Sequence, residues 1–198
     1  MRWDRFFEDL EDQLDSEWEA ERAALDTEAE RLRLSRIPLR ERLVAVAATG
    51  GQVTLDVAGS GAVAGTVTRV GADWLAVLSS ARRPTVALVP LPAVRAVGLA
   101  ADAVLSSVRE AAPGTASTQR MGFGFVLRDV VRRRIPSTVQ LVDGRILAGT
   151  IDRAGADHLD VALHEPGLPR RADSVTGFRL VPFAAVAAVR LDAPADLP

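Results

Sequence analysis

Two histidines and two carboxylates in the last quarter of the chain come closest to the spacing of a chemical site. His158, Asp160, His164 and Glu165 carry nitrogen and oxygen ligands of the kinds that bind zinc. If residues 158–163 form a strand, His158 and Asp160 share one face. His164 then lies beyond the strand, in a loop. Histidines and carboxylates that flank a hairpin are usually solvated, and we therefore expect no metal site.

The sequence lacks the patterns that indicate catalysis. Without cysteine, a thiolate nucleophile and a cysteine-based zinc site are impossible. The Gly122-Phe-Gly124 segment has no strand before it and lacks the third glycine of a dinucleotide loop. A pair of carboxylates for acid–base catalysis stays open, but no spacing selects one. We expect a protein that is not an enzyme and that uses no cofactor.

Aromatic and basic side chains form a second candidate site, for nucleic acid. Trp74 and His158 could stack on bases, because every base offers a π-face. Four arginines that end an expected helix could meet phosphate: Arg128, Arg132, Arg133 and Arg134. A structural explanation is also open, since the helix dipole favours cations near a helix C-terminus.

The basic residues of the chain are all arginine. Lys, Asn and Tyr, which have AT-rich codons, are absent, and this pattern indicates a GC-rich genome. The number of arginines is therefore poor evidence for nucleic-acid binding. Residues 1–34 have a net charge of −7, with 12 acidic residues and 5 arginines, whereas the whole chain has a net charge of −2. Such an acidic arm could dock on the more basic remainder of the chain or on a basic partner.

Residues 3–34 are expected to form one long amphipathic helix. Large apolar residues recur at steps of three, four or seven, with acidic residues on the other faces. Three arrangements remain open: packing on its own domain, a coiled-coil dimer, or docking to a protein partner. The candidate partner-binding residues lie in its first half: Trp3, Phe6, Phe7, Leu10 and Leu14.

An internal repeat is the strongest pattern in the sequence. Residues 65–77 align with residues 149–161, and each segment contains Gly-Ala-Asp at the same place. Three further pairs of segments keep the same order: residues 39–44 with 127–132, residues 53–55 with 139–141, and residues 88–94 with 180–186. This order predicts one structural unit that occurs twice.

Each copy is predicted to contain a short helix followed by five strands. In the second copy, the alternation of apolar residues and the Asp143-Gly144 turn signal predict five strands: Thr138–Val142, Ile146–Arg153, His158–Leu163, Phe178–Val181 and Val186–Leu191. Gly65 and Gly149 fall within the second strand, where glycine permits a sharp bend. We expect each copy to close around an aliphatic interior of its own.

This pattern resembles the Sm/LSm-like fold, a small SH3-type β-barrel with an N-terminal helix. In that family the loop after the second strand carries an aromatic residue that stacks on a base and an Asn that binds the base edge. Residues 157–160 and residues 73–76 are similar to this loop, but Asp160 and Ala76 stand in place of the Asn. A later Arg-Gly pair is replaced by Val-Pro. The resemblance therefore implies the barrel without the RNA pocket. The whole chain is also similar to uncharacterised proteins of high-GC Gram-positive bacteria.

The expected fold is mainly β with helices, in two tandem Sm-like five-stranded barrels that follow an N-terminal amphipathic helix. The expected segments are the acidic helix (1–37), the first barrel (38–99), a linker (100–117), the second barrel (118–192) and a flexible tail (193–198). The first ten residues are charged and contain no apolar stretch of signal-peptide length. We therefore expect a cytoplasmic protein that does not enter a membrane.

Two functions follow from this interpretation. The first is a non-enzymatic binding or scaffolding protein, in which the barrels pair within one chain and the helix mediates self-association or docking to a protein partner. The second is an Sm-like regulator that binds RNA or DNA through Trp74, His158 and the Arg128–Arg134 helix.

Overall fold

The computed structural model describes residues 22, 27–79, 84–108, 119–166 and 170–191, in two compact units, Met1–Pro38 and Leu39–Pro198. In the first unit, residue 22 and residues 27–35 are helical. Glu30 accepts two hydrogen bonds of 2.7 Å from the guanidinium of Arg33, which lower the pKa of Glu30. The rest of the expected N-terminal helix lies outside the described residues, and so do its candidate partner-binding residues: Trp3, Phe6, Phe7, Leu10 and Leu14.

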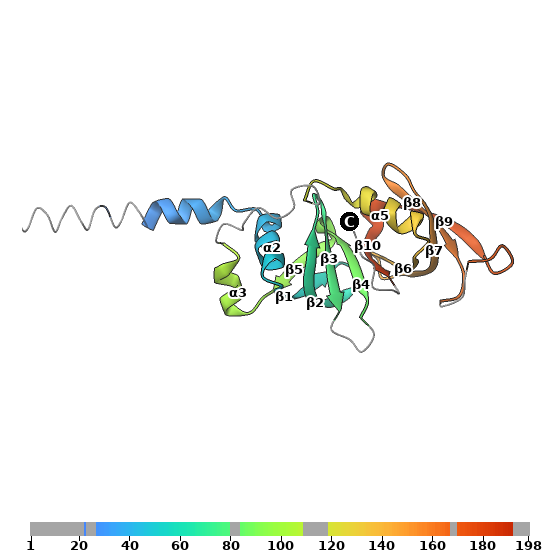
Figure 1. Ribbon diagram of the computed structural model, residues 1–198, viewed down its shortest axis with the longest axis horizontal. Coiled ribbons are helices and arrows are strands. Elements are labelled where there is room, and N and C mark those ends of the chain that lie inside the picture. The colour runs from blue at the N-terminus through green and yellow to red at the C-terminus, as the bar shows by residue number, and fades with distance from the viewer. Residues whose placement is uncertain (1–21, 23–26, 80–83, 109–118, 167–169, 192–198) are drawn as a thin grey trace, which may run out of the picture. The chain divides into compact units, whose positions relative to one another are not determined.

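The second unit is mainly β, with one open antiparallel sheet of ten strands in the order β5-β1-β2-β3-β4-β10-β6-β7-β8-β9 (Figure 1). The strands are β1 (Gln52–Val57), β2 (Gly61–Val70), β3 (Trp74–Ser79), β4 (Val86–Pro90), β5 (Val94–Gly98), β6 (Pro136–Leu141), β7 (Ile146–Ala154), β8 (His158–Leu163), β9 (Gly177–Pro182) and β10 (Val186–Leu191). The helices are α2 (Leu39–Ala48), α3 (Ala101–Ser106) and α5 (Phe123–Arg132), with 3-10 turns at Leu91–Ala93 and Phe183–Ala185. None of the described helices is both long and apolar enough to cross a bilayer.

The same strand order occurs in the first half (residues 39–106) and in the second half (residues 119–191). In each half the fifth strand pairs with the first, and the first to fourth strands pair in sequence. The ladder between the second and third strands is irregular at the same place, between Val67 and Arg69 and between Ile151 and Arg153. A ten-residue helix precedes each set of strands.

Gly65 and Gly149 occupy equivalent places in the second strand of each half. Both have a φ of +158°, a value that side chains rarely adopt. A Cβ on Gly65 would lie 2.1 Å from the carbonyl oxygen of Leu78, and one on Gly149 would lie 2.0 Å from that of Ala162. In each half, the glycine therefore lets the second strand approach the backbone of the third.

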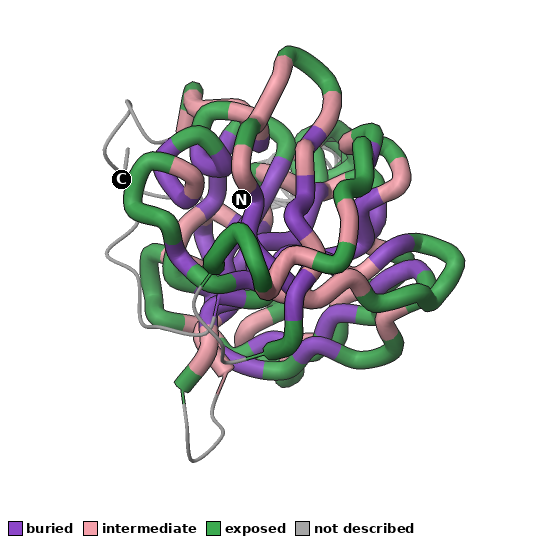
Figure 2. Tube along the Cα trace, turned by 90° about the vertical axis from the view of Figure 1, so that its right-hand side faces the viewer, coloured by how far each residue is buried: buried purple, intermediate pink, exposed green. Residues whose placement is uncertain are grey.

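The expectation of a separate interior for each half is wrong at the join between the halves. Strand β4 of the first half pairs with β10 of the second half, and one continuous sheet results. Trp74 and Leu88 of the first half belong to the apolar cluster of the second half, whereas Ala187 and Ala188 belong to that of the first half. Buried residues gather in the interior, and exposed residues occupy the outer loops (Figure 2).

The strand register also corrects the alignment of the two halves. Thr66 pairs with Gln52 and Thr150 pairs with Pro136, so Leu55 corresponds to Val139, not to Leu141. The buried residues of the two helices match when Leu43 is aligned with Leu127. The alignment by sequence paired Leu39 with Leu127, a difference of four residues. Each error equals about one structural period, two residues in a strand and 3.6 in a helix, because such a slip keeps the same face buried.

Candidate functional site

The segment that precedes α5 covers the turn between β2 and β3 of the first half. The carbonyl oxygen of Met121 accepts hydrogen bonds from the indole Nε1 of Trp74, at 2.8 Å, and from the backbone N–H of Ala72, at 2.9 Å. The exposed fraction of Trp74 is 0%. The proposed stacking of a base on Trp74 therefore fails, because the residue packs in the core at the join.

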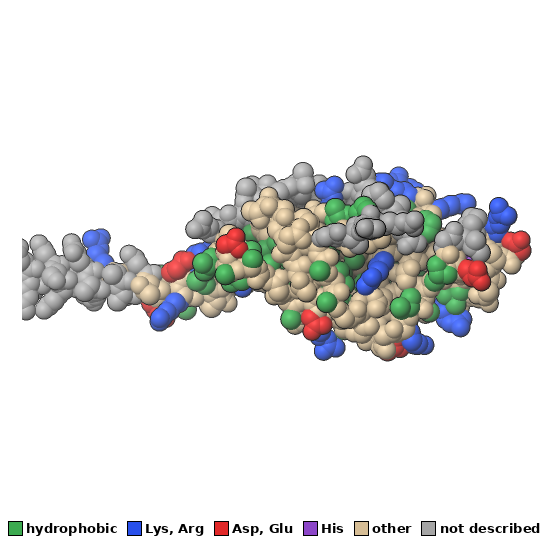
Figure 3. All heavy atoms as spheres, turned by 90° about the horizontal axis from the view of Figure 1, so that it is seen from below, with side chains coloured by type: hydrophobic (Ala, Val, Ile, Leu, Met, Phe, Trp, Pro, Cys, Tyr) green, Lys and Arg blue, Asp and Glu red, His purple; other side chains and the backbone are tan. Residues whose placement is uncertain are grey.

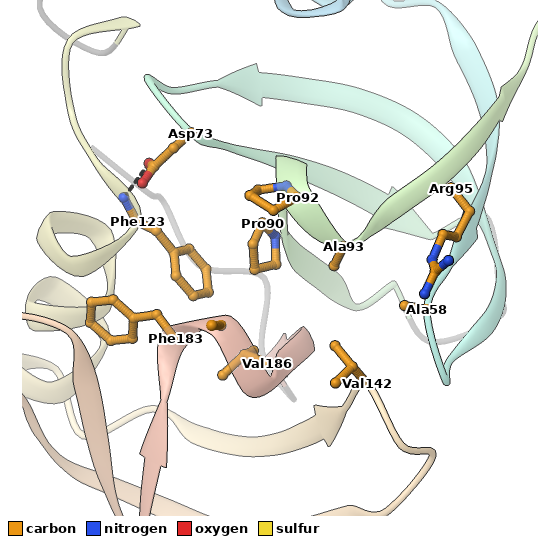
Figure 4. A pocket seen from close by; sticks show the side chains of 11 residues that line it. Ala58, Asp73, Pro90, Pro92, Ala93, Arg95, Phe123, Val142, Phe183 and Val186 are labelled. Carbon is orange, nitrogen blue, oxygen red and sulfur yellow. Dashed lines mark hydrogen bonds between the residues drawn. The ribbon is translucent and has the colours of Figure 1, made fainter.

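Asp73 supplies the N-terminal cap that α5 itself lacks. Gly122, at the N-cap position, has no side chain that could accept a hydrogen bond. Instead, Oδ1 of Asp73 accepts one from the backbone N–H of Phe123 at 2.7 Å (Figure 4). A carboxylate in this position satisfies a free N–H and interacts favourably with the positive end of the helix dipole. The first half thus stabilises a helix of the second.

Replacement of Asp73 by alanine should destabilise the protein by about 1 kcal/mol, because the first turn of α5 loses its cap. Asp157 offers a matched control. It occupies the equivalent turn of the second half, and its side chain is 88% exposed. Asp157→Ala should change the free energy of unfolding by less than about 0.5 kcal/mol. Urea denaturation followed by circular dichroism measures both, and equal losses would contradict the capping role.

An apolar cleft of about 480 Å³ lies between the two halves, next to this cap. The rings of Phe123 and Phe183 meet edge to face on one side of it, with their centroids 5.7 Å apart (Figure 4). Pro90 and Pro92 line the first-half side, and Arg95 lies at the far end. Its charged lining residues are Asp73, which caps α5, and Arg95, and the other lining residues are apolar.

The two histidines do not form a common site. His164 is buried, and its ring nitrogens bond Thr150 Oγ1, at 2.9 Å, and the carbonyl oxygen of Glu165, at 3.0 Å. His158 lies on β8 with Nε2 3.8 Å from Oδ1 of Asp160. Within the described ranges, no three His, Cys, Asp or Glu residues gather in a way that could hold a metal ion. His164 thus has a structural role.

The arginines of α5 take part in contacts within the protein. Arg132 and Arg133 form ion pairs with Asp129, whose side chain is buried, and the second pair has an Nε–Oδ2 distance of 2.8 Å. Arg128 donates a hydrogen bond of 3.4 Å to the carbonyl oxygen of Gly155, in the turn that precedes His158. Arg134 is exposed, with a φ of +52°. Of the nucleic-acid candidates, only Arg128 and His158 lie near each other, at the turn between β7 and β8.

Basic side chains follow one another along the upper right edge of the face in Figure 3, whereas acidic and apolar side chains lie singly over the rest of that face. A protein that binds nucleic acid typically shows a basic patch or stripe on one face. In this view the basic side chains are confined to that edge.

Exposed apolar residues on edge strand β9 are the feature that the sequence reasoning missed. The exposed fractions are 55% for Phe178 and 71% for Leu180, and the two residues lie on one face because they are two apart. Their counterparts on β4, Val86 and Leu88, are buried by the other half. The repeat shows that Leu180 corresponds to Leu88. The sequence alone does not show which of these two strands is covered by the other half.

Comparison of the chain with protein-family models, with curated proteins and with solved structures finds no match.

Proposed function

We propose that this protein is a non-enzymatic scaffold that associates through the free edge of its sheet at β9. In this proposal the two halves are small five-stranded barrels joined edge to edge. The repeated strand order and the repeated glycine in the second strand support that interpretation. The N-terminal segment acts as a helical arm for self-association or for docking to a protein partner, on account of its apolar stripe.

One observation carries the proposal: β9, at the end of the described sheet, exposes large apolar side chains. An edge strand presents unpaired backbone groups, and proteins usually shield such edges with charges, prolines or a covering element. Phe178 and Leu180 instead present large apolar side chains on β9, with Arg179 between them as the only charged residue of the strand. Exposed apolar surface of this kind typically marks a contact with another protein.

The burial and the contacts of its candidate residues count against the nucleic-acid alternative. Trp74, its main aromatic residue, is buried, and three of its four arginines bond with groups of the protein itself. Association through protein surfaces is therefore the function that the geometry supports best.

Replacement of Leu180 by arginine tests the proposal. We expect the full chain to form species larger than its 21.1 kDa monomer, as measured by light scattering, and we expect Leu180→Arg to remain a monomer. A charge at the centre of the edge would have to be buried without a partner in any such contact. The same measurement on a chain that begins at Ser35 separates the contribution of the arm.

Ile146→Arg is the matched control. Ile146 is also an exposed apolar residue, with a fraction of 62%, but it lies on β7, which is paired on both sides. This variant should associate as the unaltered chain does. A monomeric unaltered chain, or a Leu180→Arg variant that associates normally, would refute the proposal.

A further inference from the structure

The join between the two halves shows how a fourth strand and a fifth strand fit together in this protein. At the join, β4 is the fourth strand of the first half and β10 is the fifth strand of the second. The two strands at the ends of the described sheet are β9, a fourth strand, and β5, a fifth strand. One molecule thus presents, at opposite ends of its sheet, the two components of a junction that it has already formed once internally.

The receiving surface of the join is formed by α5 and β10. Phe123 and Val126 on the helix and Val189 and Leu191 on the strand are exposed by at most 2%, and they share a cluster with Trp74 and Leu88 of the first half. This surface is therefore filled by the side chains of the neighbouring β3 and β4.

The first half contains the corresponding surface, where α3 packs beside α2 and a groove stays open in the described part of the chain. The corresponding residues are Leu39 and Arg42 on α2, Val97 on β5, and Leu99 directly after β5, and they line a groove of about 380 Å³. The register supports the correspondence, because Val97 pairs with Leu55 as Val189 pairs with Val139. Val104 of α3, which lies beside α2 (Figure 1), also lines this groove.

The surface that would fill such a groove is exposed at the other end of the molecule. Asp160 pairs with Leu180 on β9 as Ala76 pairs with Leu88 on β4, so Leu180 is the counterpart of Leu88. Phe178 corresponds in the same way to Val86. We infer that Phe178 and Leu180 of one molecule occupy the groove between α2 and β5 of a second copy. This inference rests on the proposed association through β9.

The internal join also fixes the register of this contact. Val189 lies opposite Leu88, and Leu191 lies opposite Val86. The contact between molecules therefore places Val97 opposite Leu180 and Leu99 opposite Phe178. Because the two surfaces differ, the contact is head to tail, and it leaves one free edge of each kind for further copies. Repetition then gives a closed ring or an open filament.

Charge complementarity supports a second copy as the occupant. At the join, Val126 and Ala76 belong to one apolar cluster. Their counterparts are Arg42 and Asp160, which lies beside Leu180 on the opposing surface. Arg42 lines the groove, and among the described residues its guanidinium donates hydrogen bonds only to neutral groups there, Ser107 Oγ and the carbonyl oxygen of Val104. Two apolar residues of the internal junction are thus replaced by residues of opposite charge, one on each surface. This difference favours the pairing of unlike surfaces over the pairing of two β9 edges.

Disulfide formation between two single-cysteine variants tests the register. The chain contains no cysteine, so Val97→Cys and Leu180→Cys introduce one thiol each. Mild oxidation of an equal mixture should give a covalent dimer of the two variants, at a yield at least about tenfold above that of either variant alone, because paired strands hold opposing Cβ atoms at disulfide distance. A mixture of Val97→Cys with Ile146→Cys, which places the second thiol on an internal strand, should give none.

Complementation of two association-deficient variants tests the direction. Val97→Arg blocks the groove and leaves β9 intact, whereas Leu180→Arg blocks β9 and leaves the groove intact. Each variant alone should be a monomer with an unchanged circular dichroism spectrum. Their mixture should form a dimer and no larger species, since only one productive contact can form.

The outcomes separate this inference from the proposed function. Suppose that Leu180→Arg abolishes association, but that oxidation joins Leu180→Cys chains to each other and the two arginine variants do not complement. The association through β9 then stands, and the head-to-tail inference is overturned. A monomeric unaltered chain that yields no mixed disulfide overturns both.

Discussion

Replacement of Trp74 by alanine is expected to lower the free energy of unfolding by about 4 kcal/mol. The side chain is fully buried, in a cluster to which both halves contribute. Its removal leaves a cavity at the join, and the carbonyl oxygen of Met121 loses the indole N–H as a donor. Denaturation should be followed by circular dichroism, because the substitution also removes a fluorophore.

His158→Ala provides the control for this prediction. His158 occupies the position of Trp74 in the second half, as its equivalent pairing with Pro182 shows. Its side chain is only partly buried, and no segment of the described chain covers it as residues 119–123 cover Trp74. This variant should lose less than about 1 kcal/mol. Similar losses for the two variants would show that the join does not bury Trp74 as described.

Replacement of Gly149 by alanine should destabilise the protein by at least about 3 kcal/mol. The new Cβ would lie 2.0 Å from the carbonyl oxygen of Ala162, an atom of the neighbouring strand that cannot rotate away. The φ of +158° adds strain for any side chain. Either β7 and β8 must separate at this point or the strand must lose its bend. The melting temperature and the urea midpoint measure the effect.

Two further alanine substitutions serve as a parallel case and a control for Gly149→Ala. Gly65→Ala should cause a loss of similar size, because its Cβ would lie 2.1 Å from the carbonyl oxygen of Leu78. Gly177→Ala should be tolerated within about 1 kcal/mol, since its nearest neighbour is the end of the Arg179 side chain at 3.8 Å. Equal tolerance at all three positions would contradict the close approach of the strands.

The elements that depend on local sequence were predictable. The strands His158–Leu163 and Val186–Leu191 have the bounds that alternation predicts. The Asp143-Gly144 signal does form the turn between β6 and β7, with Gly144 at a φ of +88°. There the backbone N–H of Arg145 donates to Asp143 and is the main cause of the lowered pKa of that carboxyl. A turn of this kind is determined by a few adjacent residues, so a single sequence suffices to locate it.

The join, in contrast, could not be predicted from the sequence. Strand β4 pairs with β10 about a hundred residues later in the chain. Val86 and Leu88 give the same alternating pattern whether they face solvent, as Phe178 and Leu180 do, or a second half. For the same reason, an aromatic residue next to a turn could be interpreted as a ligand-binding group when it is a core residue. Trp74 and His158 occupy equivalent positions, and only tertiary packing distinguishes them.

The exchange of side chains between the two apolar clusters makes the halves thermodynamically inseparable. If the second half melted alone, Trp74 and Leu88 would be left facing water. If the first half melted alone, Phe123 and Val126 would be left in the same state. Unfolding of one half therefore exposes apolar side chains of both halves to water. The free energy needed to unfold either half alone thus includes part of the stability of the other. Although its strand order repeats, we therefore expect the sheet to unfold as one cooperative unit.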